Sequence, residues 1–112
     1  MINKYHKNLD LEKWNKFSKQ EQILNIASEF SRAKNWLAKN NKQETLNCLN
    51  RAFELIDLTI QSSSKEKSLN HFLRFREVLA QFYIKKNKTN DEFIKIFKTL
   101  LMFNKFTSLV KI

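Results

Sequence analysis

Apolar residues recur every three or four positions along most of the chain, which is the spacing of one face of an α-helix. The clearest run alternates between steps of three and four: Leu46, Leu49, Phe53, Ile56 and Ile60. That alternation is typical of the seam between antiparallel helices in a bundle. Similar runs in the neighbouring segments predict four helices, over residues 19–39, 42–61, 64–86 and 90–103.

A small polar residue precedes each predicted helix and is followed three positions later by a glutamate. The four pairs are Ser18 and Glu21, Asn41 and Glu44, Ser63 and Glu66, and Thr89 and Glu92. This is the pattern of a helix N-cap, in which the two residues exchange hydrogen bonds with each other's backbone. Asparagine stands for serine or threonine in the second pair and is a good N-cap residue by itself.

The four helices pair into two hairpins because only short polar segments separate the first from the second and the third from the fourth. We therefore predict an all-α fold, a four-helix antiparallel (up-and-down) bundle, with a short N-terminal segment packed on it. The single domain, 1–112, divides into a lead-in (1–17), a first hairpin (18–61), a second hairpin (62–104) and a tail (105–112). The tail either ends the fourth helix or offers an apolar patch to a second chain.

The composition supports an all-α fold, since the chain contains no glycine and no proline. Without glycine the tight turns of β-hairpins are disfavoured, and without proline the strongest helix breaker is missing. Asparagine tolerates left-handed backbone better than other residues that carry a side chain. Asn40, Asn41 and Asn87 lie where the two hairpins turn, and we expect them to serve there.

The sequence lacks the groupings that most enzymes need. A phosphate-binding loop and a nucleophile elbow both require glycine. The soft metal ligands are only His6, Cys48 and His71, which are too few and too scattered for a zinc site. No base lies at a spacing that would activate Cys48, so we expect it to be a packing residue. These absences predict a non-catalytic protein with no cofactor.

Targeting and redox signals are equally sparse. The single cysteine excludes an intrachain disulfide. No apolar run approaches the roughly 20 residues of a membrane span, and residues 1–10 lack the apolar core of a secretion signal. We expect a cytoplasmic protein without a membrane span.

The net charge of +10 suggests acidic partners, either an acidic protein or peptide surface or nucleic acid. The charge is concentrated in residues 85–112, which contain seven lysines and two acidic residues. Biased base composition in an AT-rich genome would also produce a chain rich in lysine, asparagine, isoleucine and phenylalanine. The charge therefore does not assign a function without a site.

Arg76 is unusual because apolar residues of the third helix flank it on both sides, whereas Arg74 falls on the polar side. A buried charge needs a partner. We consider three arrangements for Arg76. It pairs with a carboxylate of the first hairpin, it rests on an aromatic ring and extends outward, or it lines a groove for an acidic ligand. The carboxylates within reach are Glu29, Glu54 and Asp57.

Trp36 lies off the main apolar face of the first helix, one turn after Arg32. It is either an exposed contact residue or it packs against the lead-in around Trp14 and Phe17. Lys95 and Lys98 lie on one side of the fourth helix, where they form either a basic stripe or a solvated face.

The leading hypothesis is a protein–protein interaction or self-association module, which binds an acidic surface or forms a homodimer. Its predicted contacts are Trp36, Arg74, Arg76, Lys95 and Lys98. The alternative is an accessory protein that binds RNA or DNA through the lysines of the second hairpin. Nucleic-acid binding would weaken steeply with salt, because it depends on the release of counterions.

Overall fold

The four amphipathic segments fold into four long helices in the computed structural model, which describes residues 4–112. The regular elements, in chain order, are α1 (Leu11–Asn15), α2 (Lys19–Ala38), α3 (Lys42–Ser62), α4 (Leu69–Ile84), α5 (Asn90–Leu101) and the short 3₁₀ helix η1 (Thr107–Leu109). All regular structure in the described residues is therefore helical, and the all-α prediction is confirmed.

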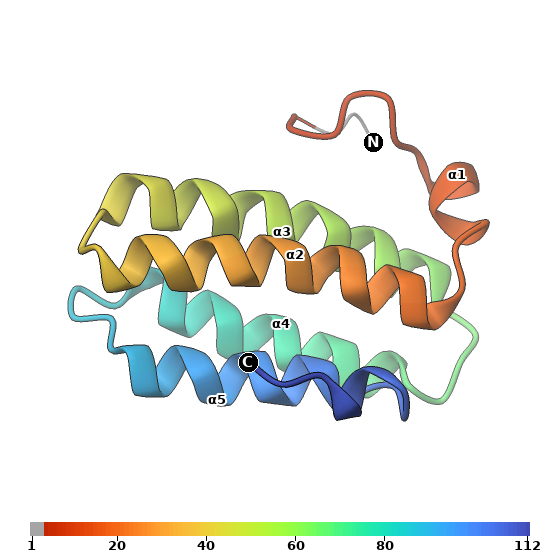
Figure 1. The fold of residues 1–112 in the computed structure, drawn as a ribbon. Helices are drawn as coiled ribbons and strands as arrows, with labels where there is room; N and C mark the ends of the chain where they lie inside the picture. The colour runs from red at the N-terminus through yellow and green to blue at the C-terminus, as the bar shows by residue number, and fades with distance from the viewer. Residues whose placement is uncertain (1–3) are drawn as a thin grey trace.

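Successive long helices run in opposite directions, as Figure 1 shows. Helices α2 and α3 form the upper layer of that view, and α4 and α5 form the lower layer. Each layer contacts the other, since α2 packs against α5 and α3 packs against α4. The arrangement is the expected antiparallel bundle of two hairpins.

Three of the four predicted N-caps are present. The Ser18 side chain accepts a hydrogen bond from the Glu21 N–H at 3.1 Å, and the Glu21 carboxylate accepts one from the Ser18 N–H at 2.9 Å. Asn41 and Thr89 likewise accept from the N–H groups three residues later, at 3.1 and 3.2 Å. These local hydrogen bonds fix the starts of α2, α3 and α5.

The fourth predicted cap, at Ser63, is wrong, and α4 begins at Leu69 instead of residue 64. Ser63 is buried at the C-terminal end of α3, where its N–H donates to the carbonyls of Thr59 and Ile60. Its hydroxyl accepts a hydrogen bond from Lys19 Nζ at 2.6 Å. Because Ser63 closes α3, it is not free to open the next helix.

An aromatic cluster forms the centre of the core. Phe30 of α2 is fully buried, with ring centroids of Phe93 and Phe97 at 5.2 and 5.5 Å and that of Phe75 at 6.1 Å. These rings come from α2, α4 and α5, and aromatic side chains contribute large buried areas. Phe30 therefore joins the two layers of the bundle.

The lead-in is anchored through Trp14 of α1, which is buried against α3. Its indole N–H donates to the Thr59 hydroxyl at 3.1 Å, and its backbone carbonyl accepts from the Gln22 side chain at 2.9 Å. A buried indole keeps its donor satisfied in this way. The predicted packing of the N-terminal segment on the bundle is thus observed.

The two hairpin turns differ in backbone conformation. Asn40 has a φ of 58°, and among the described residues it alone has a positive φ. The expectation of a left-handed asparagine holds at this turn. It does not hold at Asn87, because the longer α4–α5 loop turns without a left-handed residue.

The tail folds back onto the bundle after α5 ends at Leu101, two residues earlier than expected. Thr107 is buried, and its hydroxyl donates to the carbonyl of Leu101 at 2.6 Å. Helix η1 packs against α5 and α2, yet Leu109 remains 77% exposed. The tail therefore ends the helix, as the first alternative states, and its role as a patch for a second chain stays a prediction. None of the described helices has the length and apolarity to cross a membrane.

Candidate functional site

Helices α4 and α5 border an apolar cavity with a basic rim, which we call the α4–α5 groove. It encloses about 330 Å³ and is lined by His71, Arg74, Phe75, Val78, Lys95, Ile96, Thr99 and Phe103. A second cavity of about 250 Å³ shares Val78, Lys95 and Ile96 with it and continues toward the ion pair of Lys85 and Glu92. The groove therefore extends along both helices.

Helical spacing brings the groove residues together. On α4, His71, Arg74, Phe75 and Val78 are separated by three or four residues, so they form one stripe beside the buried face. On α5 and the residues just after it, the same spacing aligns Lys95, Ile96, Thr99 and Phe103. Phe75 and Ile96 are buried while Val78 is 45% exposed, so the floor of the groove is apolar and open to solvent.

The two basic side chains at the rim, Arg74 and Lys95, are not engaged in ion pairs in the described part of the chain. Arg74 and Lys95 are exposed, and neither forms an ion pair within residues 4–112. Glu92 lies at the far end of the groove, where Lys85 Nζ contacts its carboxylate at 2.7 Å. The rim is therefore positive near Arg74 and electrically balanced near Glu92.

The two lysines considered as a basic stripe or a solvated face, Lys95 and Lys98, are both exposed on α5 but line different cavities. Lys95 lines the α4–α5 groove, whereas Lys98 borders another cavity with Met102, Val110 and Lys111. Of the five candidate contacts, only Arg74 and Lys95 share a surface. His71 and Val78 were not among the predicted contacts, although both lie one helical turn from Arg74 and line the same groove.

Arg76 combines two of the arrangements considered for it. Its Nε donates to Asp57 at 2.6 Å and its Nη2 to the second carboxylate oxygen at 3.4 Å. The guanidinium carbon also lies 5.1 Å from the ring centroid of Phe53. Asp57 raises the pKa of Arg76. Arg76 thus clamps α4 to α3 and does not line the groove.

Trp36 is half-buried and packs against the main core, with Lys39 Nζ 5.2 Å from its ring centroid. The alternative contact with the lead-in is wrong, because Trp14 is bonded to Gln22 and Thr59, near the start of α2 and the end of α3. Trp36 lies near the opposite end of α2. It is not among the side chains that line the α4–α5 groove.

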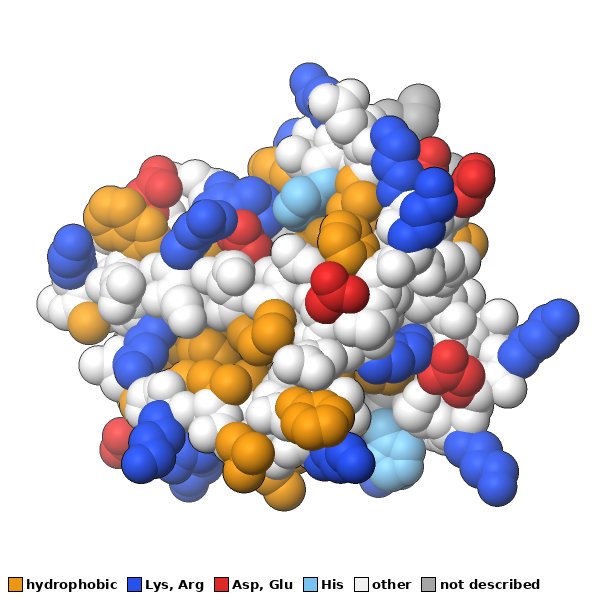
Figure 2. Space-filling view, turned by 45° about the vertical axis from the view of Figure 1, so that its right-hand side comes forward, with side chains coloured by type: hydrophobic (Ala, Val, Ile, Leu, Met, Phe, Trp, Pro, Cys, Tyr) orange, Lys and Arg blue, Asp and Glu red, His pale blue; other side chains and the backbone are white. Residues whose placement is uncertain are grey.

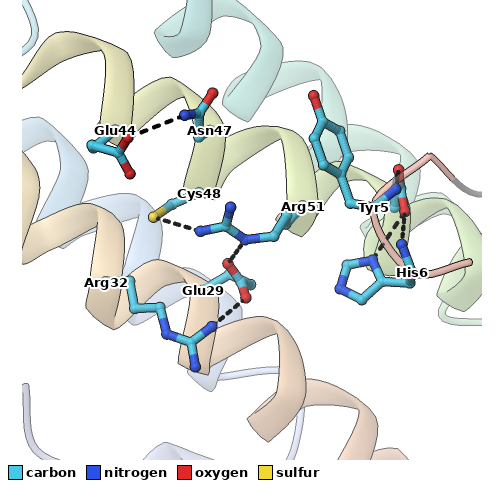
Figure 3. A network of polar contacts seen from close by, with 9 residues as sticks. Tyr5, His6, Glu29, Arg32, Glu44, Asn47, Cys48 and Arg51 are labelled. Carbon is cyan, nitrogen blue, oxygen red and sulfur yellow. Dashed lines mark hydrogen bonds and ion pairs between the residues drawn. The ribbon is translucent and has the colours of Figure 1, made fainter.

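A polar network on the other face of the bundle links α2 and α3 (Figure 3). Glu29, which is 5% exposed, accepts hydrogen bonds from Arg32 at 2.7 Å and from Arg51 at 2.8 Å. Arg51 also donates to Cys48 Sγ at 3.2 Å. Burial raises the pKa of the Cys48 thiol, which keeps it protonated and supports a packing role. Sequence analysis considered Glu29 as a partner for Arg76 and missed its pairing with Arg51.

Glu54 of α3 holds Tyr5 and His6 of the lead-in, two residues that are labelled in Figure 3. Its carboxylate accepts from the N–H groups of Tyr5 and His6 at 2.7 and 3.0 Å and from the His6 ring at 2.9 Å. Burial pushes the pKa of Glu54 up, but these hydrogen bonds outweigh it and hold that pKa below its usual range.

The segment around Tyr5 and His6 should therefore detach at acidic pH, while Trp14 stays buried. A carboxyl group with a lowered folded-state pKa contributes stability above its ordinary pKa of about 4.3, and the contribution is lost as the pH falls through the lowered value. We expect the backbone amide signals of Tyr5 and His6 to report release between about pH 5 and 2 in NMR spectra. The Glu54→Gln variant should lack this transition, and an identical transition in that variant would assign it to another group.

Comparisons with known proteins give no assignment, because no protein-family model, curated protein or solved structure matches the chain significantly. Within residues 4–112, no three His, Cys, Asp or Glu side chains lie together in a way that could hold a metal ion. The chemistry of the α4–α5 groove is thus the starting point for a functional proposal.

Proposed function

We propose that the chain is a non-catalytic interaction module that binds an acidic, amphipathic segment of another protein in the α4–α5 groove. The observation that carries this proposal is the combination of an apolar, solvent-open floor with two basic rim residues, Arg74 and Lys95, that form no ion pair within residues 4–112. Apolar contacts would supply most of the affinity, and the charges would select the partner.

The shape of the groove favours an extended or helical ligand. Helices α4 and α5 lie side by side and form the two walls, and the floor between them is apolar. This shape matches the recognition mode in which a helix of the partner lays its apolar face into a groove. A suitable partner has apolar residues every three or four positions and carboxylates beside them. The carboxylates would face Arg74 and the adjoining side of Lys95, where the lining of the groove contains no carboxylate.

Self-association is a second form of the same hypothesis, and the exposed apolar residues of the second hairpin and tail support it. Figure 2 shows hydrophobic side chains gathered over the lower layer of the bundle, with lysines and arginines around them. Met102 and Leu109 are 72% and 77% exposed. The chain has no acidic residue after Glu92. Two copies that met through this C-terminal part would therefore bring the lysines of both copies together. Salt should strengthen such a dimer and weaken binding of an acidic peptide.

The alternative of RNA or DNA binding has less support from the surface, because Lys95 and Lys98 do not line a common cavity. It stays a hypothesis that rests on the net charge. A steep loss of nucleic-acid affinity with salt would favour it.

Charge reversal at the rim tests the proposal. The probe is a fluorescein-labelled helical peptide with leucines at helical spacing and glutamates between them, and the comparison peptide carries lysines in place of the glutamates. We expect Arg74→Glu with Lys95→Glu to weaken binding of the acidic peptide about tenfold, measured by fluorescence anisotropy at about 50 mM salt. The preference for the acidic peptide over the basic one should also disappear.

The matched control is Lys7→Glu with Lys16→Glu, which changes the net charge equally. Both lysines are exposed and belong to the lead-in, which packs on α3 in the opposite layer of the bundle. An equal loss in this control would show that net charge alone drives binding and would overturn the assignment to the groove. Failure of the wild-type protein to bind the acidic peptide at all would overturn the proposal itself.

A further inference from the structure

The α2–α3 turn and the α4–α5 loop lie at the same end of the bundle, on the left of Figure 1. Together they enclose about 500 Å³, which we call the turn-end cavity. Its polar lining consists of four lysines, three asparagines and Thr45, and no carboxylate borders it. The lysines are Lys42, Lys85, Lys86 and Lys88. A cavity of this size lies within the range of small-molecule sites.

The lysines of the cavity are only partly neutralised. Lys85 pairs with Glu92 at 2.7 Å, and none of the other three forms an ion pair within the described part of the chain. Lys88 is held in place, since its Nζ donates to the carbonyl of Lys85 at 2.6 Å and lies 6.0 Å from the ring centroid of Phe82. The cavity thus contains a fixed excess of positive charge.

Lys88 and Lys42 also repel each other. Burial first, and then the neighbouring charge of Lys42, lower the pKa of Lys88. Two ammonium groups that face one cavity without a counter-charge are stabilised by any anion that enters between them. The first turn of α3 begins at Lys42, and its Glu44 N–H is taken by the Asn41 cap, so the N–H groups of Lys42 and Gln43 remain as donors at the same edge of the cavity.

The remaining wall is apolar. Leu37, Leu46, Tyr83 and Ile84 line it, and Tyr83 is held by the ring of Phe53 at 5.8 Å. A bare inorganic anion would leave this wall in contact with water. A ligand with a charged end and an apolar or aromatic body would use both parts of the cavity.

We propose that the turn-end cavity binds the phosphate group of a small phosphorylated ligand, whose aromatic or apolar body lies against Leu46 and Tyr83. The phosphate carries about two negative charges near neutral pH, which matches the excess of ammonium groups around Lys42 and Lys88. A free nucleoside monophosphate and the 5′-phosphate end of a nucleic acid share this chemistry. The site is separate from the floor of the α4–α5 groove, so it goes beyond the proposed interaction function.

Amide signals in NMR spectra test this inference on the complete chain. Inorganic phosphate, adenosine monophosphate and a 5′-phosphorylated dinucleotide are titrated separately at constant ionic strength. We expect saturable shifts of the Lys42, Gln43 and Lys88 amides, with adenosine monophosphate at least fivefold tighter than inorganic phosphate. Tighter binding of the dinucleotide than of the monophosphate would identify a nucleic-acid end as the source of the group, and the reverse would identify a free nucleotide.

The variant Lys42→Gln with Lys88→Gln should weaken adenosine monophosphate binding at least fivefold while its other amide signals keep their positions. Lys7→Gln with Lys16→Gln is the control of equal charge and should bind like the wild type. Three results would overturn the proposal: shifts that never saturate, equal weakening in the control, or equal affinity for a dinucleotide that lacks the 5′-phosphate.

A Leu46→Ala variant separates the two halves of the site, because it should bring the affinity for adenosine monophosphate toward that for inorganic phosphate. No change in that variant would overturn the role of the apolar wall.

Discussion

Replacing Phe30 with alanine is expected to lower the free energy of unfolding by about 3–5 kcal/mol, the usual cost of truncating a buried phenylalanine. Phe30 has no exposed surface, and its ring contacts Phe75, Phe93 and Phe97 from the opposite layer. The change removes apolar area from the core and leaves a cavity, which four packed helices can close only in part. Because a domain of this size has a total stability of about 5–15 kcal/mol, the variant should be markedly less stable.

Urea denaturation followed by circular dichroism at 222 nm measures this loss, provided that the transition stays two-state. Leu109→Ala is the matched control, since Leu109 is also apolar but is 77% exposed. It should change the free energy of unfolding by no more than about 0.5 kcal/mol. A loss below about 1.5 kcal/mol for Phe30→Ala would mean that the two layers are not joined through this ring.

The sequence was sufficient for the starts of α2, α3 and α5, because their N-caps are closed by hydrogen bonds within four residues. The same pattern failed at Ser63 for a long-range reason. Lys19, which lies 44 residues away, donates a hydrogen bond to the Ser63 hydroxyl. The Ser63 N–H donates to carbonyl groups at the end of α3. The local sequence pattern of an N-cap does not show that the hydroxyl and the N–H of Ser63 already form other hydrogen bonds.

The candidate site was predictable only in parts. Arg74 and Lys95 could each be placed on a polar side of a helix, but whether they face one groove depends on how α4 packs against α5. The need of Arg76 for a partner followed from its position among apolar residues. The choice of Asp57 over Glu54 and Glu29 depends on the register between α3 and α4, which no single helix encodes.

The network around Glu29 shows the same limit. Arg51 flanks the apolar ladder of α3, and its spacing within that helix does not point to a partner. Glu29 and Arg51 meet because α2 and α3 pack closely along their length. The turn-end cavity likewise depends on two loops that are far apart in sequence and meet only in the folded bundle.

Removing the Glu29 carboxylate should be the most damaging polar change in the protein. Glu29→Ala is expected to lower the free energy of unfolding by about 3 kcal/mol, because it leaves the half-buried Arg51 without its counter-charge. The side chain of Glu29 is 7% exposed and that of Arg51 is 29% exposed, so water replaces the lost contact poorly. Arg32, whose side chain is 61% exposed, should contribute no more than about 1 kcal/mol to the network.

A double-mutant cycle separates the ion pair from simple packing. Glu29→Met combined with Arg51→Met should recover much of the stability that either single change loses, because replacing both partners removes the unpaired charge while keeping the packing volume. The measurement is urea denaturation of the wild type, both single variants and the double variant. Strictly additive losses would show that the two side chains stabilise the bundle independently. A positive coupling would show that α2 and α3 are held together at this face by the charge pair.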